Sequence, residues 1–249
     1  MELIYRGLEN VLSRAKRRPY ALDREIPLRV LVAVVMRRAA WLCRGIFKTL
    51  LLQGSPRPVF MAPGVSLRNA SMVRFGHSVT LERGVIIDGL SREGIELRDN
   101  VMLGAYTTVQ ASSLSLVGAG IRFGKNSSCG PYSFIGAGGM ITIGENVIMG
   151  QHVSLHGENH NFDRVDMPIR NQGVTRKGIV IEDDCWVGAN AVFLDGAHVE
   201  RGCVIAAGAV VRGEFPAYSV VAGVPARVIR SRVPETAVQT YSRTSAALS

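Results

Sequence analysis

A period of six residues governs most of this chain. In residues 179–213, a large aliphatic or aromatic residue recurs at every sixth position, at Ile181, Val187, Phe193, Val199, Ile205 and Val211. Two residues before each of these lies Ile179 or one of five small residues, Cys185, Ala191, Ala197, Cys203 and Ala209. An α-helix repeats every 3.6 residues and a β-strand every two, so neither element alone produces this pattern.

The same phase recurs upstream in four groups of three, which are Phe75, Leu81 and Ile87; Leu97, Leu103 and Val109; Phe123, Cys129 and Ile135; and Ile143, Met149 and Leu155. Between groups the phase slips by four, eight, two and then twenty residues. A Gly-rich β-sandwich is the alternative interpretation, but it predicts uneven strand lengths rather than a fixed period.

A three-sided solenoid explains the period. Each hexad would form one short strand and a turn, and three hexads would close a coil of about 18 residues. The large residues would point inward, and the phase slips would be loops that leave at the corners. Stacked at about 4.8 Å, six such coils would make a prism about 29 Å long. The sequence therefore predicts an all-β solenoid.

The net charge of +9 is concentrated in an N-terminal arm. Residues 1–60 hold 12 Lys and Arg against 4 Asp and Glu, whereas the remaining 189 residues hold 17 against 16. Residues 26–52 predict a helix, with Pro27 in its first turn. Arg29, Arg37, Arg44 and Lys48 fall in one sector of that helix, and the opposite side is assigned to Leu31, Val35, Trp41, Leu42 and Phe47.

Three interpretations of this basic amphipathic arm are open. Such a helix suits the surface of an anionic membrane, and its longest uncharged run, seven residues, is far too short to span one. The helix could instead pack against the main domain or sister subunits. A nucleic-acid role is the least favoured, because a nucleic-acid protein usually spreads its charge over the folded part. We expect no nucleic-acid partner.

The repeat resembles the hexapeptide-repeat acyltransferases, which form left-handed parallel β-helices. The resemblance covers about residues 60–232, and it alone implies the hand of the helix. The sugar O-acetyltransferase branch, which includes galactoside and maltose acetyltransferases, is the most similar. Three segments carry this similarity: "ITIGENVIMGQHVSLHGENHNF", "IVIEDDCWVGANAVFLDGAHV" and "CVIAAGAVVRGEFPAYSVVAGVPARVIR".

We expect three parts, of which the resemblance covers only the middle one. Residues 1–58 would be the basic helical arm, and residues 59–232 the left-handed β-helix of about six coils, with a histidine-bearing loop at 156–178. Residues 233–249 would be a tail, either mobile or strapped over a neighbour. The family forms homotrimers with three sites at the subunit interfaces, so we expect a homotrimer here.

The resemblance implies that His160 is the general base. A sugar hydroxyl is a poor nucleophile at neutral pH, and histidine is the side chain whose ordinary pKa suits removal of its proton. The family carries its base 17 residues after the Ile of an "IG[DE]N" hexad, which is Ile143 here. His156 is the rival candidate. Three loop residues are candidates for orienting the imidazole or binding the saccharide acceptor: Asn159, Asn161 and Asp163.

The resemblance also implies acetyl-CoA as co-substrate, bound in a groove between subunits. Trp186 matches the family's tryptophan near the active site and the acceptor, and Ala189 and Ala207 match positions that contact the pantetheine. Arg227 and Arg230 match cations that meet the nucleotide phosphates. Two positions depart from the pattern. A family lysine is Gly213 here, where Arg212 could serve instead, and an acceptor-site asparagine has no match, with Asn126 or Ser128 as substitutes.

The leading functional prediction is an acetyl-CoA-dependent O-acetyltransferase that acts on a sugar of a surface polysaccharide or its lipid-linked precursor. An N-acetyltransferase for an amino sugar or amino acid is the alternative. Less favoured are a γ-type carbonic anhydrase-like zinc enzyme, built on His152, His156 and His160, and a non-catalytic hexapeptide scaffold. We expect no metal.

The expected location is the cytoplasm, with a peripheral position on the cytoplasmic face of the inner membrane as a further expectation. The four cysteines show no CxxC spacing and no signal peptide precedes them, which favours reduced thiols.

Overall fold

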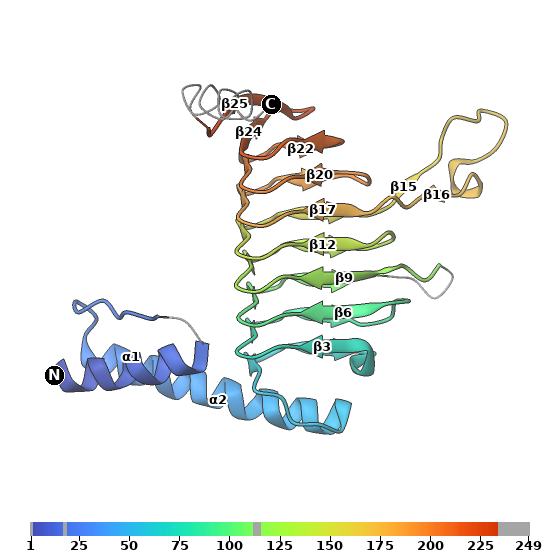
Figure 1. Cartoon of the computed structure of the whole chain (residues 1–249). Helices are drawn as coiled ribbons and strands as arrows, with labels where there is room; N and C mark the ends of the chain where they lie inside the picture. Colours follow the sequence, from blue (N-terminus) through green and yellow to red (C-terminus); the bar gives the residue numbers. More distant parts are fainter. Residues whose placement is uncertain (1, 17–18, 112–115, 234–249) are drawn as a thin grey trace, which may run out of the picture.

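The computed structural model describes residues 2–16, 19–111 and 116–233. Two helices, α1 (Glu2–Lys16) and α2 (Leu28–Gln53), precede a stack of short parallel strands that form the three faces of a prism (Figure 1). A short 3₁₀ turn, η1 (Ala70–Met72), interrupts the first coil. The all-β solenoid predicted from the period of six is thereby confirmed.

The three faces are parallel sheets whose strands follow one another at every third step along the chain. The first sheet holds β1 (Phe60–Met61), β4 (Thr80–Leu81), β7 (Met102–Leu103), β10 (Ser128–Cys129), β13 (Ile148–Met149), β18 (Trp186–Val187), β21 (Val204–Ile205) and β24 (Ser219–Ala222). The second holds β2 (Ser66–Arg68), β5 (Ile86–Asp88), β8 (Thr108–Gln110), β11 (Phe134–Gly136), β14 (Ser154–His156), β19 (Val192–Phe193) and β22 (Val210–Val211). The third holds β3 (Val73–Phe75), β6 (Gly94–Leu97), β9 (Gly120–Phe123), β12 (Ile141–Ile143), β17 (Ile179–Ile181), β20 (His198–Val199) and β23 (Glu214–Phe215).

The inward positions stack in register from coil to coil. Ile181 pairs with Ile143 below it and Val199 above it, and Val187 lies between Met149 and Ile205 in the same way. All of the predicted inward residues are buried, including the three phenylalanines, Phe75, Phe123 and Phe193. Replacing such a core phenylalanine with alanine typically costs about 3–5 kcal/mol of stability. The period of six is therefore the packing period of the core.

The solenoid has seven turns, one more than the six predicted. Met61 and Leu67 occupy inward positions below Phe75, and Phe215 and Val221 occupy them above Val211. The extra turn escaped the sequence prediction because its spacing is irregular. Leu67 lies eight residues before Phe75, and Phe215 lies only four residues after Val211.

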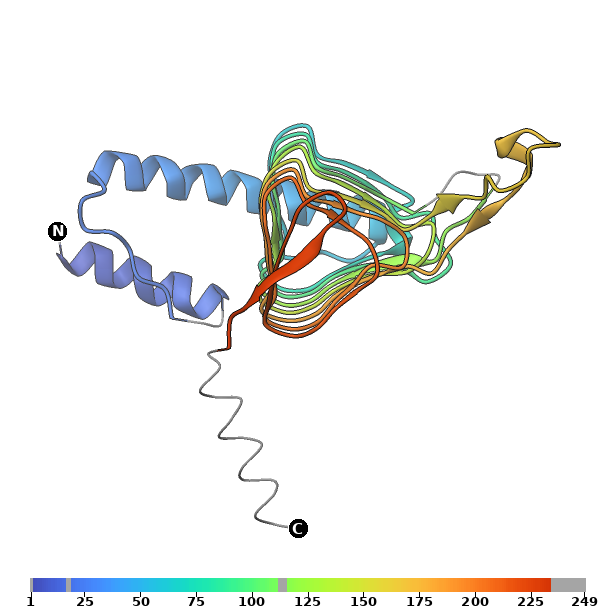
Figure 2. The same ribbon diagram turned by 90° about the horizontal axis from the view of Figure 1, so that it is seen from above.

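The phase slips are loops that leave at one corner, between the second and third sheets. They lie between β5 and β6, β8 and β9, β11 and β12, and β14 and β17. Seen from above, the coils superimpose as a triangle and the longest loop projects from this corner (Figure 2). The chain winds upward as a left-handed helix in Figures 1 and 2, as the resemblance implied.

The other two corners are built on residues with positive φ. Asn100, Asn126 and Asn146 have φ near +60° between the third and first sheets, a conformation that asparagine tolerates better than most residues. Asn100 Nδ2 donates to Asn126 Oδ1 at 2.9 Å, and Asn126 Nδ2 donates to Asn146 Oδ1 at 3.1 Å. These side-chain bonds link three successive coils at that corner.

The C-terminal half of α2 closes the base of the prism. Three of its side chains donate to backbone carbonyls of the first coil: Arg44 to Met61 at 2.9 Å, Lys48 to Val65 at 2.5 Å, and Gln53 to both Ala70 and Val73 at 2.8 Å. At Gly45 an added Cβ would overlap the carbonyl oxygen of Val59, so only glycine permits this close approach. The helix thereby satisfies backbone groups at the open edge of the first coil.

The N-terminal half of α2 extends beyond the prism and lies beside α1 (Figure 2). Tyr5 is buried there and its hydroxyl donates to the carbonyl of Ile26, while Arg24 bonds Glu9 at 2.8 Å. The helix predicted over residues 26–52 is confirmed by α2, whereas α1 was not predicted. Among the described residues, no helix is both long enough and apolar enough to cross a membrane.

The apolar side assigned to α2 from the sequence is partly wrong. Leu31 is buried, and Trp41 and Leu42 are half-buried, so this side packs inward. Phe47 lies on the other side of the helix, where it is 65% exposed, and Val35 is also exposed. The packing interpretation of the arm therefore holds for the inward side of α2, and a different side faces outward.

The top of the prism is covered by a final strand, β25 (Arg227–Ser231), which pairs antiparallel with β24. The predicted tail from residue 234 onward lies outside the described residues. All four cysteines are free thiols, as predicted, with Cys43 exposed and the others buried. Burial raises the pKa of the Cys129 thiol to about 11, because a thiolate is poorly solvated in the core.

Candidate active site

The longest interruption of the solenoid is a hairpin formed by residues 157–178, between β14 and β17. Its two strands, β15 (Asn159–His160) and β16 (Val174–Thr175), pair antiparallel, with His160 opposite Val174. A 3₁₀ turn, η2 (Ile169–Asn171), lies near the tip. The hairpin projects away from the prism at the corner between the second and third sheets (Figures 1 and 2).

The Gln172 side chain fastens the outer part of this hairpin. Its Oε1 accepts from the backbone N–H of Arg164 at 3.0 Å, and its Nε2 donates to the carbonyls of Arg164 and Met167 at 2.7 and 3.1 Å. Asn161 Nδ2 donates to the Gln172 carbonyl at 3.1 Å. This set of bonds gives the projecting segment a defined shape without a hydrophobic core of its own.

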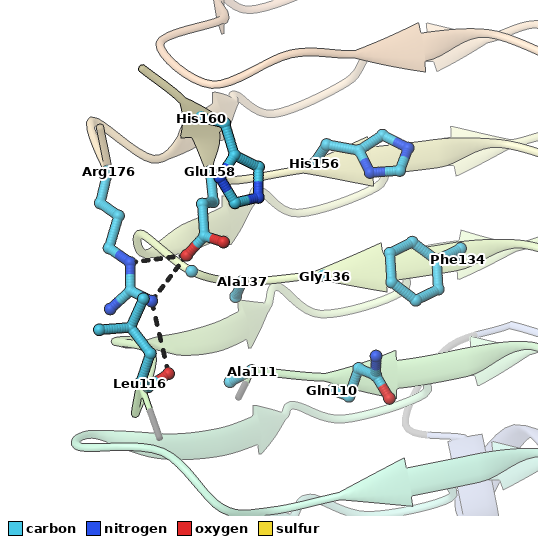
Figure 3. Close-up of a pocket in the computed structure, with 11 residues that line it drawn as sticks. Gln110, Ala111, Leu116, Phe134, Gly136, Ala137, His156, Glu158, His160 and Arg176 are labelled. Atoms are coloured by element: carbon cyan, nitrogen blue, oxygen red, sulfur yellow. Dashed lines mark hydrogen bonds and ion pairs between the residues drawn. The ribbon is translucent and has the colours of Figure 1, made fainter. Parts of the chain in front are cut away.

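A pocket of about 370 Å³ lies where the hairpin leaves the prism (Figure 3). Its floor is the outer edge of the second sheet, where Gln110, Gly136 and His156 follow one another in register on β8, β11 and β14. The ring of Phe134 lies 5.5 Å from that of His156. His160 reaches the same pocket from β15 of the hairpin, on the other side of the pocket from Phe134 and Gln110 in Figure 3.

An ion pair forms one wall of the pocket. Glu158 Oε2 lies 2.8 Å from Arg176 Nε and 2.6 Å from Arg176 Nη2. Arg176 Nη1 also donates to the carbonyl of Val117 at 3.1 Å, so the guanidinium links the hairpin to the loop between β8 and β9. Figure 3 shows the Glu158 carboxylate between Arg176 and the His160 ring. A single carboxylate oxygen thus lies against two guanidinium nitrogens, and these charge-assisted bonds hold both side chains in place.

Two glycines keep the pocket open. A Cβ added to Gly136 would lie 2.6 Å from the Phe134 ring, and one added to Gly138 would lie 2.5 Å from the Cβ of Glu158. Any larger residue at either position would displace a wall of the pocket. The His160 side chain is exposed, so its imidazole is accessible to a substrate beside the polar groups of the pocket. An accessible imidazole of this kind can act as a general base.

Part of the solenoid matches a known protein family. Residues 178–213 match the family model described as bacterial transferase hexapeptide (six repeats). These residues carry the hexapeptide repeat.

Two named relatives are similar to parts of this chain. The hexapeptide-repeat chain is 33% identical over 138 residues to a probable acetyltransferase of Mycobacterium tuberculosis, covering 55% of this chain and 44% of that protein. It is 27% identical over 177 residues to a putative lipopolysaccharide biosynthesis O-acetyl transferase of Escherichia coli K12, covering 68% and 77%. The chain thus spans less than half the length of the mycobacterial relative.

A solved structure is also similar to this hexapeptide-repeat chain. It is the hexapeptide-repeat-containing acetyltransferase of Vibrio cholerae, with a TM-score of 0.46 and 28% identity. The match covers 54% of this chain and 72% of that one.

The hexapeptide fold brings together only some of the residues predicted for the acceptor side. His156 and His160 line one pocket, as described above. Asn161 and Asp163 line a separate pocket at the hairpin tip, together with Arg164. Asn159 is half-buried on β15 beside His160. Of the proposed asparagine substitutes, Asn126 belongs to the corner ladder and Ser128 to the first sheet, and neither lines the His160 pocket.

The residues predicted for acetyl-CoA lie on other parts of the prism. Trp186, Val204, Val220 and Arg230 pair in one row across the first sheet, and Trp186 and Arg230 are exposed. Arg227 lies on the same strand as Arg230. Two smaller residues, Ala189 and Ala207, stack at the corner between the first and second sheets, because the backbone of Ala207 lies over Gly188. Arg212 follows β22 at the hairpin corner instead.

The first sheet is the face opposite the corner that carries the hairpin. Within one hexapeptide-repeat chain, the prism therefore separates Trp186 and Arg230 from His160. A catalytic constellation that uses both sets requires a second copy of the chain.

Sequence reasoning found only the two histidines of this pocket and missed its other polar and aromatic residues, Gln110, Phe134, Glu158 and Arg176. The repeat itself could have revealed Gln110, because it lies in the same phase as His156, two coils below. Glu158 stands between the two histidines in "HGENH". Arg176 carries no comparable signal, because only the hairpin fold returns it to Glu158.

The three histidines of the zinc alternative do not gather. His152 stacks on Tyr132 at 5.3 Å, at the corner between the first and second sheets, away from His156 and His160. In the part of the chain that the structure describes, no three His, Cys, Asp or Glu side chains form a group that could hold a metal.

Proposed function

We propose that this protein is an acetyl-CoA-dependent O-acetyltransferase that acts on a sugar hydroxyl. The observation that carries the proposal is the exposed His160 imidazole, held by the hairpin at the mouth of an open pocket on a hexapeptide-repeat prism. The names of the Mycobacterium tuberculosis and Escherichia coli relatives support the same reaction class.

In the proposed reaction, His160 removes the proton of the acceptor hydroxyl as its oxygen attacks the thioester carbonyl carbon. The tetrahedral intermediate then collapses, the carbon–sulfur bond breaks, and the leaving thiolate takes the proton from the imidazolium. The ester of the sugar and free CoA are the products. General base catalysis of this kind contributes typically 10²–10⁴-fold to the rate.

The proposed site is completed by a second copy in a homotrimer. His160 of one subunit would meet the Trp186 and Arg230 face of its neighbour, because each chain keeps these residues on opposite sides of its prism. Acetyl-CoA would lie along that interface, with Ala189 and Ala207 beside the pantetheine and Arg227 and Arg230 near the phosphates. A guanidinium suits phosphate because it donates two parallel hydrogen bonds.

The proposed acceptor is a sugar of a surface polysaccharide, such as a capsule, O-antigen or exopolysaccharide, or its lipid-linked precursor. The name of the Escherichia coli relative supports this acceptor class. We place the protein in the cytoplasm, peripheral on the inner face of the inner membrane, where such precursors are assembled.

The first test compares acetyl transfer by the full chain and by His160→Ala, with acetyl-CoA and oligosaccharide acceptors. We expect a loss of about 10²–10⁴-fold in kcat. The matched control is His77→Ala, because His77 is an exposed corner histidine away from the pocket. Equal activity of His160→Ala and the parent protein would refute the mechanism. Mass spectrometry after mild base treatment separates esters, which are cleaved, from the amides of an N-acetyltransferase.

The second test addresses the shared site. His160→Ala and Arg230→Ala copies, each inactive alone, are co-expressed and the mixed trimers isolated. Each mixed trimer then contains one intact site out of three, where a neighbour supplies the missing residue, so we expect activity to return to about a third of the parent level. No recovery in verified mixed trimers would show that each site lies within one chain.

A further inference from the structure

The outward side of α2 carries a continuous apolar surface, here called the outer stripe. At 100° per residue, its members fall on the side opposite Gly45 and Thr49, which face the prism. All are exposed: Val32, Met36, Cys43, Phe47, Leu50 and Leu51. Phe47 and Leu51 are 65% and 70% exposed, which is unusual for large apolar residues on a long helix.

The position of α2 directs this stripe away from the solenoid. The helix lies across the base of the prism, roughly perpendicular to the direction in which the strands stack (Figure 1). Arg44, Lys48 and Gln53 hold one side of it against the first coil. The outer stripe therefore faces along the prism axis, at the end of the molecule opposite β25.

The charge of α2 indicates what could cover the stripe. The helix contains five cations, Arg29, Arg37, Arg38, Arg44 and Lys48, and no acidic residue. Arg29 and Arg37 are exposed on the same half of the helix as the stripe. If the stripe paired with the α2 of a second copy, two strongly basic helices would lie together and repel each other. An anionic lipid surface matches both the apolar stripe and its positive flank.

We propose that the outer stripe of α2 binds the surface of an anionic bilayer and stands the prism upright on it. The apolar side chains would enter the region between headgroups and acyl chains, while Arg29 and Arg37 meet lipid phosphates. In the proposed homotrimer, three copies with parallel prism axes would place three stripes in one plane, and their combined binding would be tighter than that of one. The docking itself requires neither the trimer nor the acetyltransferase activity.

The test is sedimentation of the full-length protein with vesicles of phosphatidylcholine, with and without phosphatidylglycerol. We expect binding to the mixed vesicles that weakens as salt is added, because exposed charges are screened. The double variant Phe47→Ser, Leu51→Ser should lower binding at least about tenfold, and Arg29→Gln should lower it roughly fivefold. The matched control is Ile229→Ser, at the other end of the prism, because Ile229 is 62% exposed and should not affect vesicle binding.

A second readout uses the native protein without substitution. Cys43 is the exposed thiol of the stripe, so a maleimide should label it readily in solution and much more slowly when mixed vesicles are present. If the labelling rate of Cys43 stayed the same while the protein was bound to vesicles, another surface of the protein would contact the lipid and the proposal would be overturned. Equal binding to vesicles with and without phosphatidylglycerol would also overturn it. The proposal would also be overturned if the Phe47→Ser, Leu51→Ser variant lost its oligomeric state but still bound vesicles. The outer stripe would then be covered by a second copy of the chain rather than by lipid.

Discussion

At the scale of single residues, Arg176 connects three parts of the candidate site. It pairs with Glu158 beside His160, and it donates to the carbonyls of Leu116 and Val117 in the loop between β8 and β9, two coils below. Both charged side chains are partly exposed, so water screens the pair and its contribution to overall stability is small. Its main effect is therefore on the geometry of the pocket.

We predict that Arg176→Ala lowers kcat/KM for acetyl transfer by about 10-fold or more, because the hairpin base and the Glu158 carboxylate lose their common partner. Arg176→Lys should recover only part of the loss, because an ammonium cannot donate in the same forked geometry. Hydrogen exchange of residues 157–178 should increase in Arg176→Ala. A variant with normal exchange and normal kcat/KM would contradict this positioning role.

At the scale of elements, the hairpin is stabilised by polar bonds rather than by burial. Gln172 supplies three of these bonds, and large apolar side chains such as Phe162 and Ile169 are exposed around it. A segment with few buried contacts opens more easily than the core of the protein. The hairpin can thus open locally while the stacked coils stay folded.

We predict that Gln172→Ala increases hydrogen exchange in residues 161–173 and lowers kcat/KM, while the melting temperature falls by less than about 2 °C. The small thermal effect follows because the lost bonds lie outside the cooperative core. Gln151→Ala is the matched control, since Gln151 is an exposed corner residue. A large drop in Tm with unchanged local exchange would mean that the hairpin belongs to the core unit.

At the scale of the whole molecule, the upright orientation proposed above fixes the height of the pocket. His156 lies on β14, four strands beyond β2 in the second sheet, which is about 19 Å at 4.8 Å per strand. The helix below adds about 10 Å, so the pocket would stand about 30 Å above the lipid surface.

We predict that lipid-linked acceptors in vesicles are acetylated only when several sugars separate the acetylated unit from the lipid. Acceptors with one or two sugars should react slowly in vesicles, yet at the ordinary rate after release of the saccharide into solution. Rapid transfer to short lipid-linked acceptors would contradict the upright orientation while leaving the acetyltransferase proposal intact.

Much of the fold could be predicted from the sequence, because the information is local. An inward position at every sixth residue specifies a short flat strand and a turn, and the positions from Phe75 to Val211 are all buried in register. The prediction lost one coil where the spacing changes near Leu67 and Phe215. A search for regular spacing cannot detect a coil whose turns have other lengths.

The candidate site could be predicted only in part. His160 was found because it lies at a fixed distance from a recognisable hexad, and Gln110 shares the phase of His156. Arg176 meets Glu158 only because β15 and β16 pair antiparallel. A contact between two copies of the chain leaves no signal in the local sequence. The pairing of His160 with Trp186 and Arg230 therefore stays a prediction.

The sequence by itself determined the three-sided solenoid, the helix after Pro27 and the interruption that carries His160, because each of these depends on neighbours a few residues apart. Only the tertiary structure decided which side of α2 packs inward. Apolar residues lie on both sides of that helix, so periodicity could not choose between them. The choice rests on Gly45, whose missing side chain lets the helix approach Val59, and on the donors that reach the carbonyls of the first coil.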